Sequence, residues 1–389
     1  MAEGAVVGYG PIRQAVATAA DPVAAVAELH AALAGPELAL VLFFCAPEHA
    51  TPAFAAELAR AFPGVTVVGC TSAGEIGPGG YHEGAVTAVG LARPAFHAVA
   101  AHLFAEAALE VARAEDGIAG LRGALDRLVA GGGGSGHSRF ALLLTESDSR
   151  REEQLASLVG GTLADMPVLG GSAGHAPAGA PSRVFCDGRF HERGAVLVLV
   201  ATDRPVRSFR SQHFVASERR VVVTGADPRR RLVTELDAEP AAACYARLVG
   251  LPVEELTPMV FATNPLVVRL GGAEYVRSIQ SANPDGSLSF YSAIDEGLVL
   301  TLSEGHDLLR RTEELFAGIR AEIGPPELVI GFECVLNRLE AERTQIRHRL
   351  SRLHAANRVT GFASFGEQWG RMHVNQTFTG IAVGRGEEP

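Results

Sequence analysis

A nine-residue phrase that occurs twice holds the residues with the clearest capacity for binding chemistry. VVGCTSAGE ends at Glu75 and VTGFASFGE ends at Glu367, and the two share Val, Gly, Ser, Gly and Glu at the same five positions. Glycine-rich turns can present successive backbone N–H groups to an anion, and the glutamate beside them could bind a cationic group. The predicted ligand-binding residues are Ser72, Gly74, Glu75, Ser364, Gly366 and Glu367. The alternative is that the glycines only meet tight backbone requirements after a strand.

A looser copy of the phrase, VLGGSAGH, runs from Val168 to His175. Its residues 170–174 also match the G-x-S-x-G pattern of a hydrolase nucleophile. That mechanism needs a helix directly after the serine, which exposes the hydroxyl on a sharp turn. HAPAGAPS follows instead, with two prolines and no helical period. We therefore interpret the segment as a turn and not as a catalytic site.

Two of the 13 histidines could ligate a metal or a haem iron. His213 ends a predicted strand in RSQHFVASE, and His373 enters the final strand in RMHVNQTFTG. A histidine at the rim of an apolar cavity is a usable haem ligand, and a structural histidine is the alternative for both. Four others lie in polar, glycine-rich segments that indicate solvated side chains: His82, His137, His175 and His191.

Other catalytic and metal-binding patterns are absent from the sequence. The run GGGGSG at residues 131–136 is not followed by Lys-Ser/Thr, so it is not a phosphate-binding loop. The five cysteines are scattered without a CxxC pair, which is typical of a reduced compartment and gives no zinc site. No nucleophile–base pair is evident either, so the sequence predicts a protein that is not an enzyme.

Composition narrows the class of protein further. Of the 389 residues 47% are apolar and 20% charged, with a net charge of −10, which is typical of a globular chain with an acidic surface. Such a surface argues against binding to nucleic acid or to anionic membranes. The first residues do not resemble a signal peptide, and the apolar runs are shorter than the ~20 residues that span a bilayer. These features predict a cytoplasmic protein.

The elements that must position the candidate residues form a repeat. Strand, helix, strand and hairpin patterns follow one another in two units, at about 1–104 and 137–215, and the last hundred residues restart the repeat. This order predicts an α/β fold with mixed sheets. The second unit carries a segment, RVFCDGRFHE, that we interpret as an inserted hairpin. The pattern changes near residue 216, where a hairpin, a helix and then a meander of strands are predicted. VLNRLEAERTQIRHRLSRLHAAN predicts one long charged helix near the end.

In several phrases the chain resembles the FIST family of prokaryotic sensory proteins. VVGCTSAGEI with GAVTAVGLA is similar to the N-terminal FIST domain, and GFASFGEQ with HVNQTFTG is similar to the C-terminal one. The resemblance implies a two-domain FIST architecture, with an N-terminal domain at 1–215 and a C-terminal domain at 216–389. It also implies a small-ligand sensor that takes part in signal transduction.

The phrases SQHF and GFECVLNRLE resemble the stand-alone FIST haemoproteins that sense nitric oxide (the NosP type) more than they resemble the general family. That resemblance implies a haem b cofactor, with His213 as the first choice for the iron ligand and His373 as the second. It implies a separate histidine kinase or cyclic-di-GMP enzyme as the partner. The oligomeric state stays open, a homo-oligomer included.

The alternative function is a sensor of an amino acid or similar small polar metabolite, without haem. In that interpretation the ligand carboxylate binds a glycine/serine turn. Its ammonium group binds Glu75 or Glu367, or Asp295 in the phrase AIDEG.

Overall fold

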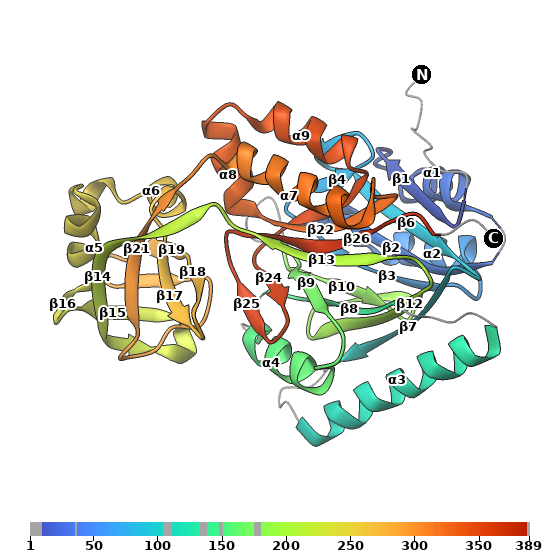
Figure 1. Cartoon of the computed structure of the whole chain (residues 1–389), viewed down its shortest axis with the longest axis horizontal. Helices are drawn as coiled ribbons and strands as arrows, with labels where there is room; N and C mark the ends of the chain where they lie inside the picture. Colours follow the sequence, from blue (N-terminus) through green and yellow to red (C-terminus); the bar gives the residue numbers. More distant parts are fainter. Residues whose placement is uncertain are drawn as a thin grey trace.

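The computed structural model shows a large body of three sheets and a smaller body attached to it (Figure 1). It describes residues 10–35, 37–103, 111–132, 138–147, 151–174 and 180–386. Helices and mixed sheets alternate along the chain, so the predicted α/β class is confirmed.

Each of the three sheets in the large body has six strands, listed here in spatial order. The first contains β1 (Ile12–Ala17), β6 (Val86–Ala92), β2 (Leu38–Cys45), β3 (Thr66–Thr71), β10 (Val184–Cys186) and β11 (Arg189–His191). The second contains β7 (Phe96–Leu103), β12 (Ala195–Thr202), β8 (Ser138–Thr145), β9 (Val168–Ser172), β24 (Glu367–Trp369) and β25 (Met372–Val374). The third contains β13 (Val206–Ser211), β26 (Phe378–Val383), β22 (Leu328–Cys334), β23 (Val359–Ser364), β4 (Glu75–Gly77) and β5 (Gly80–His82).

The three sheets have the same order of strand types and exchange their hairpins in a cycle. In each, the third and fourth strands are parallel, and the last two form a hairpin contributed by another unit. The hairpin β10–β11 of the second unit extends the first sheet, β24–β25 of the third unit extends the second, and β4–β5 of the first unit extends the third. The large body is therefore a pseudo-threefold ring of three units.

Helices cover the outer faces of the ring, and apolar residues from all three sheets fill its centre. The helices are α1 (Pro22–Leu33), α2 (Pro52–Ala61), α3 (Val111–Gly132), α4 (Glu152–Thr162), α7 (Leu308–Ile323), α8 (Val335–Arg343) and α9 (Arg347–Ala356). Phe44, Leu142 and Phe332, one from each sheet, belong to the same fully buried cluster. α2 begins where its sequence predicts, because the Thr51 hydroxyl accepts a hydrogen bond from the amide of Phe54 and proline follows the cap.

Residues 214–305 form the smaller body, which we call the inserted domain (Figure 1, left). Its strands are β14 (Phe214–Asp227), β15 (Leu232–Leu236), β16 (Glu239–Pro240), β17 (Leu266–Leu270), β18 (Ala273–Arg277), β19 (Ile279–Ala282), β20 (Leu288–Phe290) and β21 (Val299–Gly305), with helices α5 (Ala241–Val249) and α6 (Pro258–Thr263). The domain interrupts the third unit, because β13 precedes it and β26 follows it in the same sheet. Its own core packs around Tyr245 and Phe261.

Two sequence interpretations need correction. RVFCDGRFHE does form a hairpin, β10–β11, but it is not an extra segment, because β4–β5 and β24–β25 are its counterparts in the other units. The predicted long charged helix is divided into α8 and α9. Gln345 between them has φ of 59°, a left-handed conformation that interrupts a right-handed helix.

Candidate functional site

The three glycine/serine turns meet where the units join, and they bond to one another through their backbones. Ala73 N donates to Ala363 O at 3.1 Å, and Ala363 N donates to Gly74 O at 2.7 Å. Phe365 N donates to Ser172 O at 3.1 Å, and Ser172 N donates to Gly366 O at 2.8 Å. These amides and carbonyls serve the assembly of the ring, so this arrangement does not favour the predicted anion-binding role for the turns.

The hydrogen bonds also correct the alignment of the looser copy. Thr71, Ser172 and Ala363 occupy matching places in the three units. The amide of each donates a hydrogen bond to the unit whose hairpin extends its sheet. Ser172 therefore corresponds to Thr71 and not to Ser72. His175 lies outside the described residues.

Glu75 and Glu367 are buried inside the ring, and each closes its own hairpin. Ala85 N donates to Glu75 Oε2 at 3.2 Å, and Thr377 donates to Glu367 Oε2 through its amide at 3.2 Å and its hydroxyl at 2.6 Å. Burial raises the pKa of Glu75 to about 7 and that of Glu367 to about 8, against hydrogen bonds that favour ionisation. Neither side chain faces solvent, and their roles in ligand binding stay predictions.

The Ser72 and Ser364 hydroxyls donate to Glu75 and Glu367 and also lie near a backbone carbonyl, so both places can accommodate a neutral carboxyl group. Ser72 Oγ lies 3.1 Å from Cys45 O, and Ser364 Oγ lies 3.2 Å from Glu333 O. A hydroxyl has one hydrogen to donate, and a carbonyl cannot donate in return. If the serine hydrogen goes to the carbonyl, the adjacent glutamate must supply the hydrogen to the serine oxygen.

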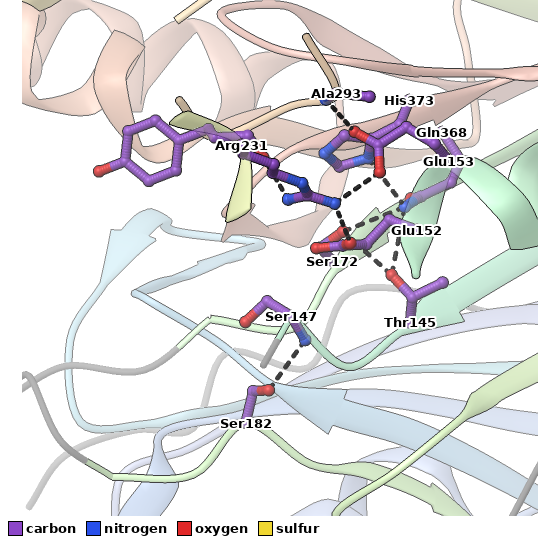
Figure 2. A network of polar contacts seen from close by, with 11 residues as sticks. Thr145, Ser147, Glu152, Glu153, Ser172, Ser182, Arg231, Ala293, Gln368 and His373 are labelled. Atoms are coloured by element: carbon purple, nitrogen blue, oxygen red, sulfur yellow. Dashed lines mark hydrogen bonds and ion pairs between the residues drawn. The ribbon is translucent and has the colours of Figure 1, made fainter. Parts of the chain in front are cut away.

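His373 belongs to a buried polar network in the second sheet (Figure 2). It pairs across the hairpin with Gln368, whose amide nitrogen lies 3.4 Å from His373 Nδ1. The same amide donates to Thr145 Oγ1 at 3.2 Å and to Ser172 Oγ at 3.1 Å, and the two hydroxyl oxygens are 3.0 Å apart. The network thus joins β8 and β9 of the second unit to the hairpin of the third.

An arginine from the inserted domain completes this network (Figure 2). Arg231 Nη2 lies 2.6 Å from Glu152 Oε2 and 2.5 Å from Glu153 Oε2, both in the first turn of α4. Glu153 Oε1 also accepts a hydrogen bond of 2.6 Å from the amide of Ala293. Arg231 has φ of 53°, so a strained backbone places its side chain here. We call Thr145, Glu152, Glu153, Ser172, Arg231, Arg277, Gln368 and His373 the junction cluster.

Burial sets the charges of the junction cluster. It lowers the pKa of His373 to about 4, helped by Arg231 and Arg277 and opposed by Glu153, so the imidazole is neutral at pH 7. Burial raises the pKa of Glu152 to about 7 against the attraction of Arg231. Burial opposes ionisation of Glu153, but His373 and Arg231 together outweigh it and lower the pKa of that carboxyl group. The cluster therefore combines two guanidinium groups with one carboxyl group whose charge is easily changed and one that stays ionised.

Several buried polar atoms around the cluster have no hydrogen-bond partner among the described residues. They are Arg277 Nε, Ser292 Oγ, Gln368 Oε1, His373 Nε2 and Asn375 Oδ1. Ser292 lies between Tyr291 and Ala293, which contact Arg231 and Glu153 through their backbones. A buried polar group without a partner costs about 1–3 kcal/mol, so several in one place indicate a site for water or a polar ligand.

The predicted haem ligands do not have surroundings that fit haem. His213 Nε2, the nitrogen that iron usually takes, lies 2.8 Å from Glu340 Oε2, and the ring packs 4.1 Å from that of Phe214. His373 Nε2 faces Gly366, where an added Cβ would lie 2.4 Å away, and charged residues surround it. Within the described residues no group of three or more His, Cys, Asp or Glu is arranged to hold a metal ion.

Asp295 and His213 are not part of the junction cluster. Asp295 is exposed, and its carboxylate caps the amide of Glu296 at 2.8 Å. His213 and His373 are not brought together, because His213 contacts α8. Sequence reasoning missed Glu152, Glu153 and Arg231, whose phrases REEQ and PRRRL indicate only a helix start and a basic turn.

The interface between the first and second units differs from the junction cluster. A cavity of about 450 Å³ lies there between α2 and the hairpin β10–β11. Its Arg183 already bonds to Glu192 Oε1 at 2.7 Å and to Ala50 O at 3.0 Å. This interface holds no concentration of buried polar atoms like that of the junction cluster within the described residues, so we do not assign it a ligand.

Comparison with known families agrees with the fold and the repeated phrases. The FIST N domain matches residues 39–239, and the FIST C domain matches residues 241–369. Among curated proteins, none matches the chain significantly. In the described part of the chain, no helix is both long and apolar enough to cross a bilayer. The chain belongs to the FIST family, whose domains sense small ligands in signalling proteins.

Proposed function

We propose that this chain senses a small zwitterionic metabolite of the amino-acid class, which binds at the junction cluster. The observation that carries the proposal is the set of buried polar atoms without partners beside paired acidic and basic side chains. Arg231 and Arg277 suit a ligand carboxylate, because guanidinium groups bind carboxylates through two parallel hydrogen bonds. Glu152 and Glu153 suit its ammonium group.

The position of the cluster supplies a route from binding to signalling. Arg231 and Ala293 belong to the inserted domain, whereas Glu152 and Glu153 belong to α4 of the ring. A ligand that inserts among them changes how firmly the inserted domain is held against the ring. Such a ligand shifts a partner's affinity by the coupling free energy, typically about 1–3 kcal/mol. A separate histidine kinase or cyclic-di-GMP enzyme is the partner we propose.

A thermal-shift screen with the twenty amino acids, each in excess, tests the ligand class. A ligand present at about 100 times its Kd stabilises the folded state by about 2.7 kcal/mol. We expect one amino acid or a few to raise the Tm, and Arg231→Gln to abolish the rise. Arg247→Gln, an exposed arginine of the same domain, is the matched control and should keep it. Trp369, the only tryptophan, follows Gln368 in β24, so its fluorescence should change on binding.

Two results would contradict this proposal. One is that no amino acid raises the Tm, and the other is that Arg231→Gln responds like the wild type. An absorption spectrum after addition of haem separates the haem prediction from this one. A Soret band that shifts with nitric oxide and is lost in His213→Ala or His373→Ala would replace the amino-acid proposal with a haem-based sensor.

A further inference from the structure

The third sheet contains a counterpart of the junction cluster. The hairpin β4–β5 extends β23 beside α9, as β24–β25 extends β9 beside α4. Tyr81 faces Ile76 in the first hairpin, and His373 faces Gln368 in the other. Glu333 and Thr145 pair with Ala363 and Ser172, which hold matching places in the ring. Tyr81 and Glu333 therefore stand where His373 and Thr145 stand in the second sheet.

Tyr81 provides the aromatic ring against which the charged groups of this counterpart pack. Its hydroxyl donates to Glu333 Oε2 at 2.7 Å and lies 3.2 Å from His354 Nε2. These bonds hold the ring in place. The guanidinium carbons of Arg338 and Arg347 lie 5.1 and 5.8 Å from the ring centroid, within the range of a cation–π interaction.

The two arginines share one carboxylate oxygen from the chain itself. Arg338 Nη2 lies 3.1 Å from Glu83 Oε1, and Arg347 Nη2 lies 2.6 Å from the same atom. The Arg338 side chain is 5% exposed, but that of Glu83 is 68% exposed. Glu83 also precedes Gly84, which has φ of 66°, in the loop after β5. The carboxylate thus reaches a buried cation from the solvent side.

Arg338 retains unused binding capacity. Its Nη1 is buried and has no hydrogen-bond partner within the described ranges. It packs against the turn at Gly74, where an added Cβ would be only 1.8 Å from Nη1, so the glycine is what lets the guanidinium lie there. Nη2 donates to Glu83 Oε1 and also to His82 O, at 3.2 Å, so one terminal nitrogen of the guanidinium is in use and the other is not.

We propose that Arg338 and Arg347 form a second binding site, for a small oxyanion such as a carboxylate or a phosphate, which Glu83 occupies in the absence of that ligand. A free oxyanion has two or more oxygens and can bond to both nitrogens of the Arg338 fork, whereas the tethered Glu83 uses one. Because the chain has a net charge of −10, anions are not attracted to it in general, and a specific site is needed to hold one. This inference does not depend on the proposed function.

Titration calorimetry of the full chain tests the site, with inorganic phosphate and acetate titrated separately at constant ionic strength. Glu83→Gln removes the competing carboxylate and should tighten binding by up to about fivefold, since an exposed ion pair is worth about 0–1 kcal/mol. Arg347→Gln and Arg338→Lys should weaken it, and whichever anion binds more tightly identifies the ligand chemistry. Glu342→Gln removes the other carboxylate near Arg347, 3.4 Å from its Nε, and should leave binding unchanged.

Three outcomes would overturn the proposal. The first is that Glu83→Gln binds neither anion, and the second is that Glu342→Gln tightens binding as much as Glu83→Gln does. The third is that Arg347→Gln has no effect, which keeps the test decisive even if Arg338→Lys fails to fold. Trp369 fluorescence should not respond to phosphate, so binding at the junction cluster is distinguishable from binding here.

Discussion

Gly361→Ala is expected to destabilise the ring by more than about 3 kcal/mol, enough to prevent folding in many backgrounds. An added Cβ at Gly361 would lie 1.8 Å from the carbonyl oxygen of Gly331 on the neighbouring parallel strand. Backbone cannot move aside as a flexible side chain can, so β23 would have to separate from β22. Gly170, the equivalent glycine of the second unit, would meet Leu143 O at 1.9 Å and should behave alike.

Gly120→Ala is the matched control. Gly120 lies in α3 with nothing within 4 Å of an added Cβ, so alanine should stabilise the protein by about 0.5–1 kcal/mol through helix propensity. The urea midpoints of the two variants and the wild type give the comparison. Equal midpoints for Gly361→Ala and the wild type would show that the strands do not approach as closely as described.

The free energy of unfolding is expected to fall as the pH rises from about 4.5 to about 8, and Glu367 should be a main cause. Burial raises the pKa of Glu367 from 4.5 to about 8 in the folded protein. Between these pH values the folded state keeps a proton that the unfolded state has lost, so folding becomes less favourable as pH increases. The contribution is fully present below pH 4.5 and is lost as the pH rises through 8. One such group contributes a slope of about 1.4 kcal/mol per pH unit.

Glu367→Gln should remove this slope without disturbing the hairpin. Ser364 Oγ donates to Glu367 Oε1 and Thr377 donates to Oε2. The amide oxygen of glutamine can accept from Thr377, and the Ser364 hydroxyl can turn to Glu333 O and accept from the amide nitrogen. Relative to the wild type, the variant should gain roughly 2 kcal/mol between pH 6 and pH 8. Denaturation at several pH values measures the gain, with the half-exposed Glu314→Gln as the control. A constant difference between variant and wild type at all pH values would show that Glu367 is ionised in the fold.

The repeated phrases were enough to predict much of the fold. They predicted the α/β class, the restart of the repeat near the end and the FIST resemblance, because strand–turn units of this kind have a local hydrophobic and glycine pattern. The local sequence pattern gave a wrong alignment at a place where contacts with neighbouring units determine the structure. The serines of VVGCTSAGE and VLGGSAGH suggested that Ser172 matches Ser72, but hydrogen bonds to the other turns place Ser172 at the position of Thr71.

The candidate site was likewise predicted from the sequence only in part. His373 was predicted from its residue type, and the structure brings it to the junction cluster. Its neighbours Glu152 and Arg231 are 79 residues apart and come from different bodies, so no spacing in the chain could connect them. Glu75 and Glu367 were predicted to bind a ligand, and that role stays a prediction. Their complete burial against the next unit is a tertiary feature that the sequence did not indicate.

The sequence by itself determined the units: which segments are strands, where most helices begin and which turns require glycine, since these follow from local periodicity, caps and backbone sterics. Only the tertiary structure decided how the units exchange hairpins in a cycle and which side chains meet across their borders. Exchange depends on pairing between strands far apart in the chain, such as β24 with β9. Burial then sets the charge of each carboxyl group there, because desolvation depends on what covers a residue and not on its neighbours in sequence.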